Sequence, residues 1–175
     1  QNKALQQCDP MSVISAAMIA ASLDLPITPG LGFAHIVPYK GVAQFQLGWK
    51  GYVQLGMRSA QYRTMHAAPV HEGQLVDENE FTGEMMFRKE RASDKITGYV
   101  FYFKLLNGFE KYVYMSRENC ELHAKRYSQS YKKNYGTWVD DFDAMALKTV
   151  VKQGLSKWGV LSVEMQKAIE VDQGV

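Results

Sequence analysis

Apolar residues near the start of the chain predict a helix. Asp9 and Pro10 supply an acidic N-cap and a proline at the first helical position, a common way for a helix to begin. The residues that follow, Met11 to Leu23, are almost all Ala, Ile, Val and Met. A helix that is apolar on most of its faces is a buried one, so we expect this helix in the core.

The next segment predicts a short hairpin and a second helix. Two prolines and a glycine between Leu25 and Gly30 mark a loop. Phe33–Val37 and Val42–Leu47 have the composition of strands, and the Tyr39-Lys40-Gly41 turn places a lysine near the hairpin tip. Apolar residues recur loosely at helical spacing from Trp49 to Ala60, which predicts a helix there.

Strand-forming residues predominate from Thr64 to Met115. Ile96–Leu106 and Phe109–Met115 are rich in Tyr, Phe and Val, and they flank Asn107-Gly108, a dipeptide typical of hairpin turns. We therefore expect an antiparallel hairpin at this position.

Three helices are predicted after the strands. Ser116 is positioned to cap a helix that ends near Tyr127, and Thr137-Trp-Val-Asp140 matches a capping signature at the start of the next helix. A last helix is expected over Ser162 to Asp172. The order of elements predicts an α+β fold in which an antiparallel sheet with hairpins packs against helices. The helix after Asp140 has apolar residues at steps of three and four: Ala144, Leu147, Val151, Leu155 and Trp158.

Length and composition indicate one domain over residues 1–175. Hydrophobic residues make up 46% of the chain, which is enough for one core.

Cys8 and Cys120 lack the paired spacing of metal sites or disulfide scaffolds, so a reducing cytoplasm is expected. The sequence has no apolar run near the roughly 20 residues of a membrane span, and no signal-peptide pattern. Because the chain starts at Gln1 rather than Met, we expect an ordered fragment of a longer protein.

Charged residues are distributed unevenly. The net charge is only +2, yet Leu25 to His71 contains no Asp or Glu. A long carboxylate-free segment can present a surface of one sign to a polyanion, which points to nucleic acid. Trp49 or Tyr52 could stack on an unpaired base, although the alternative is that the aromatics form core and the cations are merely solvated. The cations of this segment are Lys40, Lys50, Arg58 and Arg63.

Two further groups of cations could contact phosphate. Lys148 and Lys152 lie four residues apart on one face of a predicted helix, at the border of its apolar stripe. Ordinary lysines at the edge of a buried helix are the alternative. Lys125 and Arg126 begin a basic, tyrosine-rich stretch that runs to Tyr135, for which a solvated loop is the alternative.

The segment from Glu72 to Asp94 has the opposite charge. It contains seven carboxylates and three cations. Such asymmetry suggests separate roles for separate surfaces. We expect this segment to meet basic surface on a neighbouring copy of the chain, or to keep nucleic acid away.

Other chemistries have little support in the sequence. The chain lacks a Gly-x-x-x-x-Gly-Lys-Ser/Thr loop, and its four histidines form no i, i+4 pair. Neither ATP nor NAD is therefore expected as a cofactor. Asp140, Asp141 and Asp143 could bind a hard cation as in a nuclease, but acidic residues at a helix start more simply favour the helix dipole. Mg²⁺ is expected only as a counterion.

Several motifs together resemble the RecT branch of the RecT/Red-beta phage recombinases. They occur in the family's order and span nearly the whole chain. The chain departs from the pattern in two places: Lys40 runs almost directly into Gly41, which shortens the hairpin, and Lys152 stands where many relatives carry arginine. The motifs are Cys8-Asp-Pro-Met-Ser-Val13, Leu31-Gly-Phe33, Val37-Pro-Tyr-Lys40, Gln44-Phe-Gln-Leu-Gly-Trp-Lys-Gly-Tyr52, Ile96-Thr-Gly98, Tyr114-Met-Ser116, Gly136-Thr-Trp138 and Met145-Ala-Leu-Lys-Thr-Val-Val-Lys152.

The resemblance implies a core like that of Rad52-type annealing proteins. It also implies a protein that is not an enzyme, anneals complementary single strands without ATP in phage recombination, assembles into rings or filaments on DNA, and works beside a phage exonuclease in the bacterial cytoplasm. A single-strand-binding module that protects DNA without annealing, and a metal-dependent nuclease, are the alternatives. The expected groove is lined by Lys40, Lys50, Arg58, Lys148 and Lys152. The full set of predicted DNA-binding residues is Lys40, Gln46, Trp49, Lys50, Tyr52, Arg58, Lys125, Arg126, Trp138, Lys148, Lys152 and Lys157.

Overall fold

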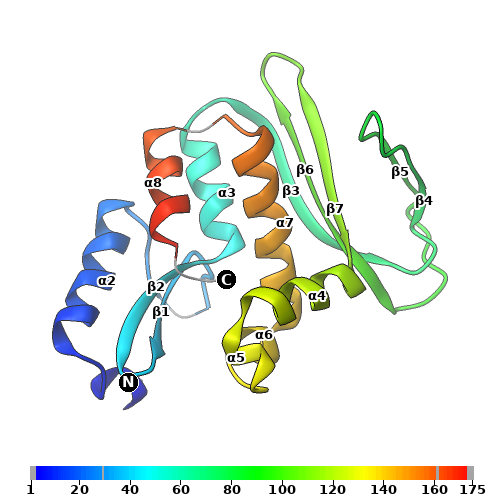
Figure 1. Cartoon of the computed structure of the whole chain (residues 1–175). Helices are drawn as coiled ribbons and strands as arrows, with labels where there is room; N and C mark the ends of the chain where they lie inside the picture. The colour runs from blue at the N-terminus through cyan, green and yellow to red at the C-terminus, as the bar shows by residue number, and fades with distance from the viewer. Residues whose placement is uncertain (1–2, 29, 161, 173–175) are drawn as a thin grey trace. The chain divides into compact units, whose positions relative to one another are not determined.

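The chain divides into two compact units. The structure is a computed structural model that describes residues 3–28, 30–160 and 162–172. The first unit combines Gln1–Arg58 with Leu161–Gly174, and the second comprises Ser59–Val160. Antiparallel strand pairs together with helices make this an α+β fold, as predicted (Figure 1). The first unit contains α1 (Lys3–Gln6), α2 (Pro10–Ser22), β1 (Ala34–Tyr39), β2 (Val42–Leu47), α3 (Trp49–Arg58) and α8 (Val163–Val171).

Strands β1 and β2 form the predicted hairpin with a lysine at its tip. They pair antiparallel, and Tyr39 opposite Val42 is the last pair before the turn. The two turn residues, Lys40 and Gly41, have φ of 49° and 78°. Two successive left-handed residues are what a tight two-residue hairpin turn requires, because this turn matches the right-handed twist of the strands. The prediction of a short hairpin is confirmed.

Helix α2 begins as predicted but is not buried as predicted. The Asp9 carboxylate accepts a hydrogen bond from the Ser12 amide at 2.9 Å, so the N-cap is confirmed. Within the helix, however, the buried residues are Ala16 and Ala20. The helix packs mainly on β2 of a two-stranded hairpin, which is too narrow to cover more than one of its faces. Three large apolar residues are left more than half exposed: Met11, Ile14 and Met18.

Helix α8 and Asp172 pack into the first unit. Ser162 caps α8 by accepting from the Met165 amide, so this predicted helix is confirmed. Just beyond α8, the buried Asp172 carboxylate accepts from the Leu47 amide at 3.0 Å and from the Tyr52 hydroxyl at 2.7 Å. Burial, reinforced by the neighbouring carboxylate, raises the pKa of Tyr52, which keeps its phenol protonated as a donor.

The second unit is built on a three-stranded antiparallel sheet in the order β3-β6-β7. The predicted β6–β7 hairpin is confirmed, with Lys104 opposite Glu110 before the turn. No helix among the described residues has both the length and the apolar character needed to cross a membrane. The elements of this unit are β3 (Tyr62–His71), β4 (Leu75–Glu78), β5 (Met85–Phe87), β6 (Ile96–Leu105), β7 (Glu110–Ser116), α4 (Arg117–Tyr127), α5 (Gln129–Lys132), α6 (Thr137–Asp140) and α7 (Phe142–Trp158).

Helix α7 covers one face of this sheet. It packs against all three strands, and Figure 1 shows it running along them. On β6, every second residue is buried toward the core: Tyr99, Phe101, Phe103 and Leu105. Contact with α7 is close at Gly154, where a Cβ would lie 2.6 Å from a ring carbon of Phe101.

The start of α7 differs from the prediction. Thr137–Asp140 forms a separate short helix, α6, whose N-cap Gly136 makes no side-chain capping bond. Helix α7 begins at Phe142, where the Asp141 carboxylate accepts from the Ala144 amide at 3.0 Å. The capping role assigned to Thr137 was therefore wrong, because the chain changes direction at Asp141 between the two helices. The cap of α4 is confirmed, since Ser116 accepts from the Asn119 amide.

Replacing Tyr52 by phenylalanine tests the role of the Asp172 carboxylate. Tyr52→Phe removes one of the two hydrogen bonds described for this buried group while keeping the ring. We expect the free energy of unfolding to fall by about 1–3 kcal/mol, because a buried acceptor loses its partner. Urea denaturation followed by circular dichroism measures this. Tyr39→Phe, in the same unit but not buried, is the matched control and should change stability little; an equal loss in both variants would contradict the assignment.

Candidate nucleic-acid interface

The β1–β2 hairpin offers one polar face. Along β2, Ala43, Phe45 and Leu47 are buried, whereas Gln44 and Gln46 on the opposite face are partly exposed. Phe45 and Leu47 therefore belong to the core of the first unit. His35 lies opposite Gln46 in the strand register and is exposed.

Sequence reasoning selected Gln46 but missed Gln44 and His35 as members of this face. The two-residue period of strands would have found Gln44, since it is two residues from Gln46. At the tip, Lys40 is exposed, and its Nζ lies 5.3 Å from the centre of the Tyr39 ring.

Two glycines fix the start of α3. The Gly48 amide donates to the Phe33 carbonyl at 2.9 Å. A Cβ on Gly48 would lie 2.1 Å from the Gly32 carbonyl oxygen, and one on Gly51 would lie 2.2 Å from the Phe33 carbonyl oxygen. Both distances are shorter than any side chain could tolerate, so the glycines allow the backbone of residues 32–33 to pack directly against α3.

This packing places Trp49 and Lys50 in the first turn of α3. Lys50 is exposed, and its Nζ lies 5.9 Å from the centre of the Trp49 ring, which is half-buried. The methylene chain of Lys50 runs close to Gly32, which has φ of 74°. The Lys50 ammonium is therefore carried on a packed stem beside an aromatic ring, an arrangement suited to a phosphate next to a stacked base.

Arg58 has a role that sequence reasoning did not anticipate. Its guanidinium donates to the Leu23 carbonyl at 2.7 Å and to the Asp24 carbonyl at 2.6 Å. The Asp24 carboxylate is 3.9 Å away. Arg58 thus binds the carbonyls that α2 leaves unpaired at its end, and this holds α2 and α3 together within the first unit.

The remaining predicted cations lie in the second unit, and they differ in exposure. Lys125 and Arg126 are exposed in the last turn of α4, and Lys157 is exposed near the end of α7. Lys152 is half-buried, whereas Lys148 is only 4% exposed within the apolar face of α7. Of the predicted pair on α7, Lys152 is the better placed to reach solvent.

Tyr52 and Trp138 were predicted to contact DNA, and the structure places both in the core. Tyr52 is 0% exposed and bound to Asp172. Trp138 is 1% exposed and packs edge-on against Phe142, with ring centres 5.3 Å apart, and against Tyr131. Neither ring offers a face to a base. The sequence pattern could not separate these aromatics from surface ones because burial depends on the neighbours supplied by other elements.

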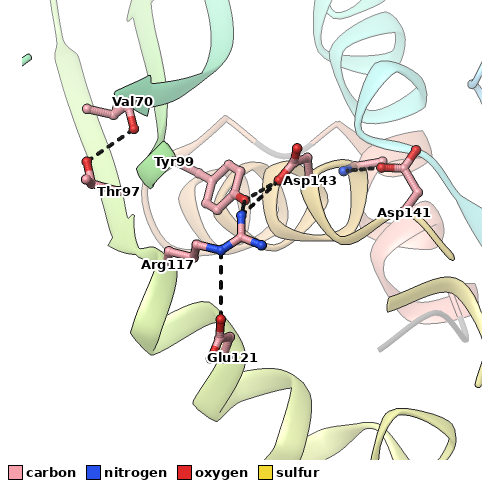
Figure 2. A network of polar contacts seen from close by, with 8 residues as sticks. Val70, Thr97, Tyr99, Arg117, Glu121, Asp141 and Asp143 are labelled. Carbon is pink, nitrogen blue, oxygen red and sulfur yellow. Dashed lines mark hydrogen bonds and ion pairs between the residues drawn. The ribbon is translucent and has the colours of Figure 1, made fainter. Parts of the chain in front are cut away.

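The aspartates at the start of α7 have structural roles (Figure 2). Asp143 accepts hydrogen bonds from the Tyr99 hydroxyl and from Arg117, whose Nη1 is 3.3 Å away. Arg117 also lies over the Phe142 ring and reaches Glu121 at 3.8 Å. Burial and the hydrogen bond to Asp143 raise the pKa of Tyr99.

This network connects β6, α4 and α7, while Asp141 caps α7. The nuclease alternative requires Asp140, Asp141 and Asp143 as metal ligands. Two of them, Asp141 and Asp143, instead make hydrogen bonds that stabilise α7. Among the described residues, no cluster of three or more His, Cys, Asp or Glu is arranged to hold a metal ion.

A family model and two known proteins match this chain. The model of the RecT family matches residues 1–174. The chain is 56% identical over 166 residues to the uncharacterized protein YqaK of Bacillus subtilis (strain 168), covering 94% of this chain and 57% of YqaK. It is 29% identical over 180 residues to Protein RecT of Escherichia coli (strain K12), covering 97% of this chain and 65% of that protein. The chain thus spans less than two thirds of either relative.

A substitution at Gly51 tests how the first turn of α3 is positioned. Gly51→Ala puts a methyl group against the Phe33 carbonyl, so residues 32–33 must move away. We expect about 1–3 kcal/mol of destabilisation and weaker binding of single-stranded DNA, because Lys50 loses its packed position. Thermal unfolding and fluorescence anisotropy measure the two effects. Met57→Ala, on the exposed face of the same helix, should change stability by less than about 0.5 kcal/mol; similar effects of both substitutions would argue against the close approach.

Proposed function

This chain belongs to the RecT family, and on that basis we propose that it is an ATP-independent single-strand annealing protein of phage homologous recombination. The observation that carries the proposal is the acid-free segment around Gln44–Tyr52. It folds into a hairpin and a helix that expose Lys40 and Lys50, while Phe45, Leu47 and Tyr52 form core. The Gln44–Tyr52 motif thus coincides with a surface suited to phosphate.

Annealing makes specific physical demands. Two DNA backbones repel each other, so the protein must neutralise phosphates on both strands while the base edges stay free to pair. Sequence specificity then comes from base pairing, and the protein needs no readout of its own. In the first unit, Lys40, Lys50 and the Gln44–Gln46 face would contact the backbone, with Trp49 available for stacking. In the second unit, the exposed cations Lys125, Arg126 and Lys157, together with Lys152, would do the same.

The chemistry of annealing breaks and forms no covalent bond. We therefore expect no catalytic residue and no nucleotide cofactor, with Mg²⁺ acting only as a counterion. A partner must expose the single strands, and an exonuclease of the same phage in the bacterial cytoplasm would supply this activity. Repeated binding along DNA also requires self-association into a ring or filament.

Replacing Lys50 tests the phosphate contacts. Lys50→Gln should weaken binding to single-stranded oligonucleotides of any sequence and reduce the slope of log K against log salt by about 0.7, the value for one phosphate contact to a single strand. Fluorescence anisotropy titrations from low to high salt measure both quantities. Lys89→Gln, which removes a cation from the acidic segment, is the matched control and should leave the slope unchanged. An unaltered slope for Lys50→Gln would remove this residue from the interface.

An annealing assay separates the proposal from its two alternatives. Complementary labelled oligonucleotides, mixed with the protein in EDTA and without ATP, should pair faster than they do alone. A module that only protects single strands would slow pairing. DNA cleavage that appears when Mg²⁺ is restored would instead favour the nuclease alternative.

A further inference from the structure

The β4–β5 hairpin of the second unit exposes apolar side chains, with Phe81 in its turn. Phe81 is 91% exposed, and Val76 and Met86 are also exposed. Figure 1 shows the hairpin beyond the β7 edge of the sheet. A phenylalanine exposed to this extent buries little apolar surface and so adds little to the stability of the single chain. Exposed aromatic side chains of this kind are common where a protein partner binds.

The tip is held in a fixed shape. The Asn79 side-chain oxygen accepts from the Phe81 amide at 3.1 Å and from the Thr82 amide at 3.2 Å. The Asn79 carbonyl accepts from the Gly83 amide at 2.7 Å. At the base of the hairpin, Phe87 packs against Tyr112 of β7, with ring centres 5.8 Å apart. Because the turn is already ordered, docking Phe81 would cost little conformational entropy.

The charge around the tip indicates the kind of partner. Residues 72–87 carry five carboxylates and no Lys or Arg. This surface repels a DNA backbone and attracts a basic protein surface. The occupant must therefore combine cations with an aromatic or apolar site for Phe81.

This chain itself contains such a surface, elsewhere in the same unit. Residues 122–139 carry four cations and no Asp or Glu. In this stretch Lys132 and Lys133 are exposed, and so are the rings of Tyr127 and Tyr135. Among the described residues, none of these four cations forms an ion pair. The exposed stripe of α2, by contrast, offers apolar residues but no cation of its own to match the carboxylates.

We infer that the β4–β5 hairpin of one copy docks on the α4–α5 surface of the next, with Phe81 against the tyrosines and Glu78 and Glu80 facing Lys132 and Lys133. The inference rests on the proposed self-association and names the two surfaces that would produce it. The two surfaces differ, so a pair of copies still has one free hairpin and one free α4–α5 surface, at opposite ends. Further copies can therefore add by the same contact.

Charge reversal tests this contact and leaves Lys125 and Arg126, the cations of this surface in the predicted DNA-binding set, in place. The hairpin variant is Glu78→Lys with Glu80→Lys, and the helix variant is Lys132→Glu with Lys133→Glu. In sedimentation velocity on long single-stranded DNA, neither variant alone should form the assembly that the wild-type protein forms. All four substitutions in one chain should restore it, because the pairs are matched again. Failure of the combined chain to reassemble would overturn the inference.

Removing the apolar contact provides a second test. Phe81→Ser should raise the dissociation constant between copies at least tenfold, whereas Val163→Ser, at an exposed apolar residue of α8, should leave it unchanged. If Met18→Ser disrupts the assembly of copies and Phe81→Ser does not, the contact lies on α2 and the inference is overturned. So would a wild-type protein that stays monomeric on long DNA.

Binding to an oligonucleotide too short for two copies separates failure of the inference from failure of the proposed function. If this binding persists while the charge variants assemble normally, the named contact is wrong and the proposed DNA binding stands. If the wild type does not bind the short oligonucleotide, the proposed function itself fails.

Discussion

The first unit depends on one buried carboxylate. A buried carboxylate is tolerated only when it is hydrogen-bonded. Asp172 meets that condition through the Leu47 amide and the Tyr52 hydroxyl, which are 125 and 120 residues away along the chain. The same two bonds join the chain's last described residue to β2 and α3. The elements that carry Lys40 and Lys50 are thereby held by a contact that neither could make alone.

The second unit is organised by packing rather than by charge. Alternate aromatic residues of β6 pack toward α7, and Gly154 lets the helix approach the sheet closely. The Tyr99–Asp143–Arg117 network lies at the margin of this core and joins β6, α4 and α7. A rigid core leaves the exposed cations of α4 and α7 on well-defined elements, as the proposed binding of phosphates would require.

The two kinds of surface in this chain fit a protein that acts as an assembly. Exposed cations lie at the start of α3, at the β1–β2 hairpin tip, on α4 and on α7, while residues 72–87 around β4–β5 carry five carboxylates and no Lys or Arg. A polyanion would bind the first set and avoid the second. The proposed self-association then uses the acidic hairpin, whereas the β1–β2 hairpin tip and the start of α3 would contact DNA alone.

Local features were determined by the sequence alone. The Asp9 and Ser116 caps, the Lys40-Gly41 turn, the last helix and the β6–β7 hairpin were all predicted, because each depends on residues only a few positions apart. Tertiary structure decided which side chains are buried. It placed Tyr52, Trp138 and Lys148 inside, left one face of α2 exposed, and engaged Arg58 with the end of α2. These outcomes depend on how the elements pack together, and the type and spacing of a residue do not reveal which neighbours other elements will bring to it.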